Sequence, residues 1–133
     1  MPARRNPFQY ALLRVIPDLA RGESLNVGII LFAPTKRFLG TRLTLDESRL
    51  AALAPGFPPD AIRPHLDGIS HIAAGRPEGG PIARSSLAER FHWLVSPSST
   101  SIQPSEVHTG LCSDPATELD RLFGTLVATP RSS

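Results

Sequence analysis

Three apolar segments of strand length follow one another in the first third of the chain, and they constrain the fold more than any other feature. They span residues 8–16, 25–33 and 38–45, and the short stretches between them contain proline, glycine and aspartate. Such residues favour turns, and short connections make sequential strands antiparallel neighbours. We therefore expect a three-stranded antiparallel meander at the N-terminus.

Alternation along these segments assigns the side chains to the two faces of the sheet. In the first segment both alternating sets are mainly apolar, as expected for a central strand that is covered on each side. In the second, strict alternation places Leu25 and Val27 on the same face as Ile29. Gly28, inside this segment, is typical of a bulge or of a close approach by another group.

Four helices are expected after the strands, from capping residues and apolar periodicity. Asp46 can cap a short helix that reaches Ala54. A second, amphipathic helix begins between Asp60 and Pro64 and ends at Gly75, because proline fits only the first turn. The last two are a helix opened by the capping box from Ser86 to Glu89 and reaching about Val95, and a helix capped by Asp114 with an apolar stripe up to Val127.

The expected fold class is α+β, a small antiparallel sheet with about four helices packed mainly on one face. Residues 100–104 can add a fourth strand, which Pro104 would confine to an edge of the sheet. The length of 133 residues, with 41% hydrophobic and 20% charged residues, favours one globular domain over residues 8–128. Residues 1–7 and 129–133 are expected to be flexible tails.

Composition excludes several classes of function. No apolar run approaches the roughly 18 residues that a membrane-spanning helix requires. Cys112 is the only cysteine, so no disulfide can form within the chain, which favours the cytoplasm, and its expected role is that of a small apolar residue. The net charge is only +2 and the basic residues are scattered, which makes nucleic-acid binding a weak prediction.

A polar cluster on the otherwise apolar hairpin is the first candidate site. It comprises Arg14, Asp18, Arg21, Glu23 and Asn26. One interpretation is a salt-bridged hairpin end in which Glu23 pairs with Arg14 or Arg21. The other is a clamp for an anion or carboxylate, because arginine offers planar bidentate donors. The two interpretations can coexist.

The second candidate is His108, in a predicted loop before the last helix, with Thr109 beside it. An imidazole that titrates near its ordinary pKa of about 6.5 can act as an acid, a base or a ligand. A lone histidine in a loop is, however, more often a turn residue. No histidine stands at a ligand spacing from another His, Asp or Glu, so neither a metal nor a cofactor is expected.

The chain resembles a small bacterial family known as domain of unknown function 3037. The resemblance rests on FQYALLRVIPDLARGESLNVGIILFAP, FLGTRLTLD, LAERFHWLVSP and QPSEVHTGL, and it covers residues 8–127. Members share an RGE-x-x-NVG core, here Arg21 to Gly28, and an HTG turn, here His108 to Gly110. The resemblance implies no established reaction. It implies a partner or regulatory role, because genes for such proteins often lie beside one for a kinase related to the bacterial persistence-toxin kinase.

We therefore expect a small cytoplasmic binding or accessory domain that acts with a protein partner, with that kinase as the candidate. The first alternative is a small hydrolase or phosphate-handling enzyme in which Arg14 and Arg21 hold an anion while Glu23 or His108 transfers a proton. This alternative requires those side chains to converge in one cleft. The second alternative is a weak nucleic-acid binder, whose affinity would fall steeply with salt. The oligomeric state stays open.

Overall fold

The computed structural model describes residues 4–97 and 100–128 of the chain. The strands and longer helices follow one another as β1 (Asn6–Val15), β2 (Leu25–Ala33), β3 (Phe38–Leu43), α1 (Glu47–Leu53), α2 (Arg63–Ala74), α3 (Leu87–Leu94), β4 (Ile102–Pro104), β5 (His108–Cys112) and α4 (Pro115–Leu126). The fold is α+β, as predicted. Of the expected tails, residues 1–3 and 129–133 lie outside the described residues, whereas Asn6 and Pro7 already belong to β1.

All the strands pair antiparallel in one sheet. Its order is β3-β2-β1, and the outer edge of β1 is shared by β4 and β5. Both short strands pair directly with β1. Between them, the Ser105 hydroxyl accepts a hydrogen bond from the Leu12 amide at 2.9 Å, and the Ser105 amide donates to the Leu12 carbonyl at 2.8 Å. The meander and the fourth edge strand are thus confirmed.

The prediction of a loop at His108 is wrong, because residues 108–112 form a strand beside the first half of β1. Gly110 allows this pairing. A Cβ atom at Gly110 would lie 2.7 Å from the ring of Phe8, so only glycine lets the two strands meet over that ring. A five-residue segment with a central glycine carries too little alternation to indicate a strand by itself.

A β-bulge in β2 changes which side chains share a face. Leu13 pairs with Gly28 but Arg14 pairs with Asn26, so Val27 is the extra residue. The bulge that Gly28 predicted is confirmed. The predicted face assignment is wrong, because the extra residue inverts the alternation. Leu25 and Val27 pack with Ile30, and Ile29 packs on the opposite face.

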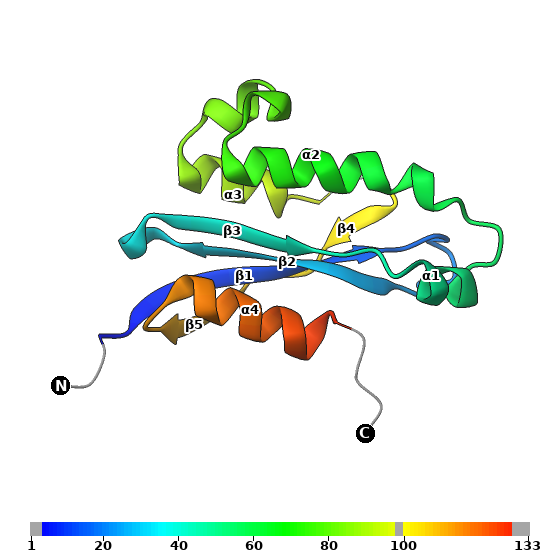
Figure 1. Ribbon diagram of the computed structural model, residues 1–133, viewed down its shortest axis with the longest axis horizontal. Coiled ribbons are helices and arrows are strands. Elements are labelled where there is room, and N and C mark those ends of the chain that lie inside the picture. Colours follow the sequence, from blue (N-terminus) through cyan, green and yellow to red (C-terminus); the bar gives the residue numbers. More distant parts are fainter. Residues whose placement is uncertain (1–3, 98–99, 129–133) are drawn as a thin grey trace.

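Helices cover both faces of the sheet (Figure 1). Helices α1, α2 and α3 pack over one face, around a core that includes Leu13, Ile30 and Phe91. Helix α4 covers the other face, where Leu119 and Leu122 pack against Ile29 and Leu31. Both faces of β1 and β2 are apolar, and each therefore needs a covering layer.

The predicted helix ends agree with the structure. Asp46 accepts a hydrogen bond from the Arg49 amide, and Ser86 accepts one from the Glu89 amide, which caps α1 and α3. Helix α2 ends at Gly75 with φ of 73°. Its last carbonyls also accept hydrogen bonds from the guanidinium of Arg90 on α3.

Candidate functional site

The loop between β1 and β2 is shaped by Asp18. The carboxylate of Asp18 accepts a hydrogen bond from the Ala20 amide at 3.0 Å, and its carbonyl accepts bonds from the amides of Arg21 and Gly22 at 3.2 and 3.1 Å. Gly22 has φ of 73°, a conformation that favours glycine. Asp18 and Gly22 therefore form the turn on which the neighbouring charged residues stand.

Arg21 and Glu23 form an exposed ion pair at this loop. The Arg21 Nε and Glu23 Oε1 atoms lie 2.5 Å apart, and the hydrogen bond to Glu23 raises the pKa of Arg21. Glu23 thus pairs with Arg21, as the interpretation of a salt-bridged hairpin end predicted. With Pro17 and Asp18 the pair lines a shallow hollow of about 620 Å³, which the proline-rich linker after α1 closes on its other side.

Arg14 and Asn26 lie on the α4 face of the sheet, so the predicted cluster is divided. The Asn26 side-chain amide donates a hydrogen bond to the Leu126 carbonyl at 3.0 Å, which ties the hairpin to the last turn of α4. Arg14 is half-buried and makes no ion pair within the described residues. The hollow that Arg21 lines does not include Arg14.

His108 lies beside the middle of β1. It pairs with Tyr10, and the centroids of their rings are 5.1 Å apart. Glu23 precedes Leu25, which pairs with Val15. The five steps along the strand from Tyr10 to Val15 span about 17 Å. The structure therefore does not bring His108 and Glu23 into one cleft.

Thr109 and Cys112 have different environments on β5. Thr109 is exposed, on the face of the sheet opposite to His108. Cys112 is buried in the core beneath α4, and its pKa is raised by burial, then by the nearby Glu118 and Asp114 carboxylates. These surroundings fit the expected role of a small apolar residue. Within residues 4–97 and 100–128, no three His, Cys, Asp or Glu side chains gather as a metal site would require.

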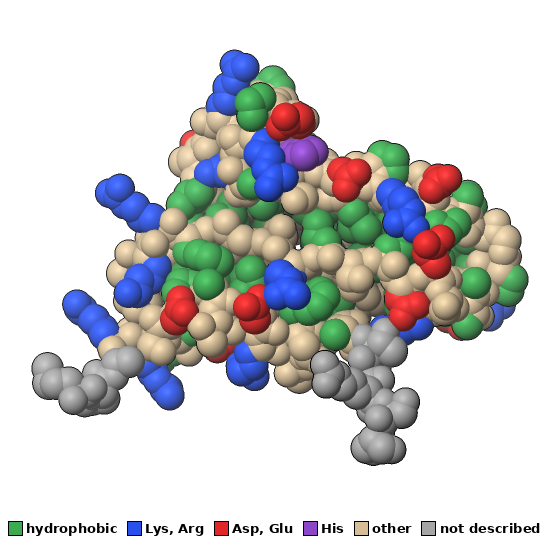
Figure 2. Space-filling model, viewed as in Figure 1, with side chains coloured by type: hydrophobic (Ala, Val, Ile, Leu, Met, Phe, Trp, Pro, Cys, Tyr) green, Lys and Arg blue, Asp and Glu red, His purple; other side chains and the backbone are tan. Residues whose placement is uncertain are grey.

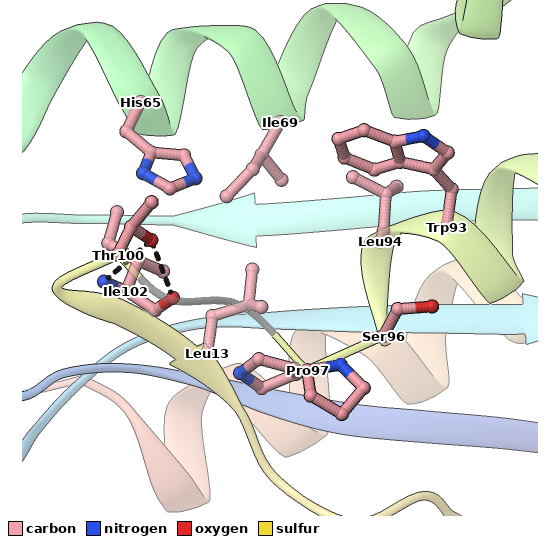
Figure 3. Close-up of a pocket in the computed structure, with 10 residues that line it drawn as sticks. Leu13, His65, Ile69, Trp93, Leu94, Ser96, Pro97, Thr100 and Ile102 are labelled. Carbon is pink, nitrogen blue, oxygen red and sulfur yellow. Dashed lines mark hydrogen bonds between the residues drawn. The ribbon is translucent and has the colours of Figure 1, made fainter.

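A cavity between α2, α3 and β4 was not predicted from the sequence (Figure 3). Its volume is about 430 Å³. His65 and Ile69 project into it from α2, Trp93 and Leu94 border it from α3, and Leu13 forms its floor on β1. The rest of its lining comes from Ser96, Pro97, Thr100, Ile102 and Pro104.

Trp93, at the rim of this cavity, is 56% exposed. Its position off the apolar stripe of α3 was the signal that could have revealed this. Leu87, Phe91 and Leu94 form that stripe, and Trp93 points away from it. An exposed tryptophan beside an apolar cavity is a common feature of binding surfaces.

Of the polar side chains that line the cavity, that of His65 makes no hydrogen bond in the described structure. The Ser96 hydroxyl donates to the His92 carbonyl at 2.6 Å, and the Thr100 hydroxyl bonds to the backbone of Ile102. Burial lowers the pKa of His65, so its imidazole is neutral at pH 7. The cavity therefore suits an apolar group that carries one hydrogen-bonding atom.

The fold and these surfaces define a small α+β domain without an assembled catalytic cluster in its described residues. No helix among those residues has both the length and the apolar character needed to cross a membrane. A family model described as "Protein of unknown function (DUF3037)" matches residues 10–127, and the chain belongs to this family. The chain matches no curated protein and no solved structure.

Proposed function

We propose that this protein is a cytoplasmic binding domain that recognises a protein partner by taking one of its hydrophobic side chains into the cavity beside Trp93. The observation that carries the proposal is the half-exposed Trp93 at the mouth of an apolar cavity. Tryptophan is enriched among the residues that dominate binding energy at protein interfaces. Covering this side chain and the cavity with a partner would remove apolar surface from water.

The lining of the cavity favours a protein side chain over a charged metabolite. Its walls are mainly leucine, isoleucine and proline, and none of the described residues that line it is Asp, Glu, Lys or Arg. His65 would offer one hydrogen bond to an aromatic hydroxyl, an indole or a backbone group. The family resemblance supplies the candidate partner, a kinase related to the bacterial persistence-toxin kinase.

Co-purification with that kinase tests the proposal. We expect a complex with the unmodified chain and a loss of affinity of about 30-fold or more, about 2 kcal/mol, for Trp93→Ala. Leu111→Ala is the matched control, because Leu111 is similarly exposed at 58% but lies on β5 and does not line the cavity. Absence of a complex at micromolar concentrations, or equal losses for the two variants, would contradict the proposal.

Intrinsic fluorescence gives an independent measurement, because Trp93 is the only tryptophan of the chain. A partner that covers the indole should shift its emission to shorter wavelength. The same titration with DNA and RNA at two salt concentrations tests the nucleic-acid alternative, which requires affinity to fall steeply with salt. The enzyme alternative is less well supported, because Arg14 and His108 lie outside the hollow that Arg21 and Glu23 line.

A further inference from the structure

Strand β3 presents an open edge of the sheet. It lies at the end of the strand order, with β2 on its inner side. The Thr44 amide donates to the Val27 carbonyl, and the register from Leu43 back to Phe38 is regular. Because hydrogen-bonded pairs alternate in antiparallel sheets, the backbone N–H and C=O groups of Leu39, Thr41 and Leu43 point outward. None of these six groups has a hydrogen-bond partner in the described part of the chain.

The two edges of the sheet differ in how they are protected from pairing. The opposite edge is interrupted by Pro104, which has no N–H, and by the irregular residues between β4 and β5. Strand β3 contains no proline and no bulge. Its one charged side chain, Arg42, lies over the ring of Phe123 at 4.5 Å and pairs with Asp120 on α4, which holds it on the α4 face. The usual protections of an edge strand are therefore missing from β3.

Apolar side chains flank this edge above and below. Leu39 and Leu43 face the core under α2, Phe38 faces α4, and all three are only partly buried. Figure 2 shows the molecule from the side on which β3 lies, with hydrophobic side chains on either side of a tan band of backbone and other side chains. A strand added here would cover apolar surface in addition to forming hydrogen bonds.

Charges at the two ends of β3 favour one particular partner for its open edge. Lys36 and Arg37 precede the strand, are exposed and form no ion pair within the described residues. Asp46 and Glu47 follow the strand; Asp46 caps α1, and Glu47 pairs with Arg63 on α2. A second copy of the chain that runs antiparallel would bring the basic end of each β3 opposite the acidic end of the other. A parallel copy would bring like charges together.

We propose that two copies of this chain pair through their β3 strands, antiparallel, about a two-fold axis at Thr41. Every outward N–H and C=O group of Leu39, Thr41 and Leu43 then finds a partner, which gives six hydrogen bonds between the copies. Leu39 lies opposite Leu43 of the second copy. Gly40 lies opposite Arg42 of the second copy and leaves room for its side chain. Such a two-fold interface is the commonest kind in homo-oligomers.

Light scattering coupled to size-exclusion chromatography tests the pairing. The unmodified chain should show twice its mass of 14.3 kDa across a dilution series. Thr41→Pro removes one outward N–H, and proline is tolerated where that group faces solvent, so the variant should fold and show the mass of one chain. Thr41→Val keeps the N–H and the strand preference and should stay a dimer, as should Trp93→Ala.

A cysteine at the axis tests the register. In a pair centred on Thr41, the two Cα atoms at this position are about 5.5 Å apart, within the range of a disulfide. Thr41→Cys should therefore form a covalent dimer on mild oxidation, whereas Thr109→Cys on the other edge should not. A single-chain mass at the highest concentration, or a dimer that Thr41→Pro leaves intact, overturns the proposal. A dimer that Thr41→Pro separates but that Thr41→Cys does not cross-link overturns the axis at Thr41.

Discussion

The hydrogen bond from Asn26 to the last turn of α4 predicts a strong effect for an almost isosteric substitution, Asn26→Asp. The Asn26 amide donates to the Leu126 carbonyl at 3.0 Å. At neutral pH the substituted side chain would instead place a carboxylate oxygen against that carbonyl. The carbonyl belongs to the C-terminal end of a helix, where the helix dipole is negative and disfavours an anion.

The loss of stability expected for Asn26→Asp is the sum of three contributions. Loss of the hydrogen bond costs about 1 kcal/mol, which is the whole effect expected for Asn26→Ala. The unfavourable helix dipole adds about 0.3–1 kcal/mol, and the facing oxygens add a further cost of about 1 kcal/mol. Asn26→Asp should therefore lower the free energy of unfolding by about 2–3 kcal/mol. In a domain of this size each kcal/mol corresponds to about 3–4 °C in Tm.

Urea unfolding at two pH values measures this effect and its cause. The carboxylate should have a raised pKa in the folded variant, so its destabilisation is present at neutral pH and is lost as the pH falls through that pKa. Near pH 4 the protonated group can donate to Leu126, and the difference between Asn26→Asp and Asn26→Ala should then shrink. Equal stability of Asn26→Asp and the unmodified protein at pH 7 would refute the structural role of Asn26.

Three further substitutions test the packing, the cavity and the helix contact. Gly28→Ala should destabilise the fold by about 1–3 kcal/mol in urea unfolding, because its Cβ would overlap Leu43 Cδ2 and lie 3.0 Å from the Arg42 carbonyl oxygen. His65→Gln should remove a pH dependence of the free energy of unfolding. Because the folded state lowers the pKa of His65, the unfolded state binds more protons below about pH 6.5, and the unmodified protein should lose stability as the pH falls from there. Arg90→Ala should cost about 2 kcal/mol, because it removes the donor to the last carbonyls of α2.

Each of these substitutions has a control variant or an outcome that would contradict its prediction. Gly124→Ala, on an exposed helix position with nothing within 4 Å of the new Cβ, should stabilise the protein by about 0.5–1 kcal/mol. A Gly28→Ala variant as stable as Gly124→Ala would contradict the tight contact with β3. If the stability of His65→Gln changes between pH 7 and pH 5 as much as that of the unmodified protein, His65 is excluded as the source of the pH dependence. Arg90→Lys should recover only part of the loss, since lysine lacks the second arm of the guanidinium.

Local signals were sufficient for most secondary-structure elements. The capping residues Asp46 and Ser86 and the terminator Gly75 act within a few residues of chain, so their effect is visible in the sequence. The meander was also predictable, because both faces of β1 are apolar and the connections are short. The strand at His108 was missed, since its partner is β1, about 100 residues earlier in the chain.

The candidate site was only partly predictable for the same reason. The pairing of Arg21 with Glu23 is local, and the sequence offered it as one of two interpretations. The separation of Arg14 and Asn26 from Asp18 depends on the faces of the sheet and on the position of α4. The cavity beside Trp93 joins α2, α3 and β4, and no segment of the sequence contains it.

The sequence alone determined the three-stranded start, the four helices and the absence of an obvious catalytic motif, because apolar period and capping are properties of neighbouring residues. Only the tertiary structure decided which side chains meet. One extra residue at the bulge beside Gly28 inverts the faces of β2, and the placement of α4 opposite the other helices sends Asn26 to a helix end. The tertiary structure also places β3 at the edge of the sheet, with no further strand on its outer side among the described residues, because strand order is fixed by contacts between distant segments.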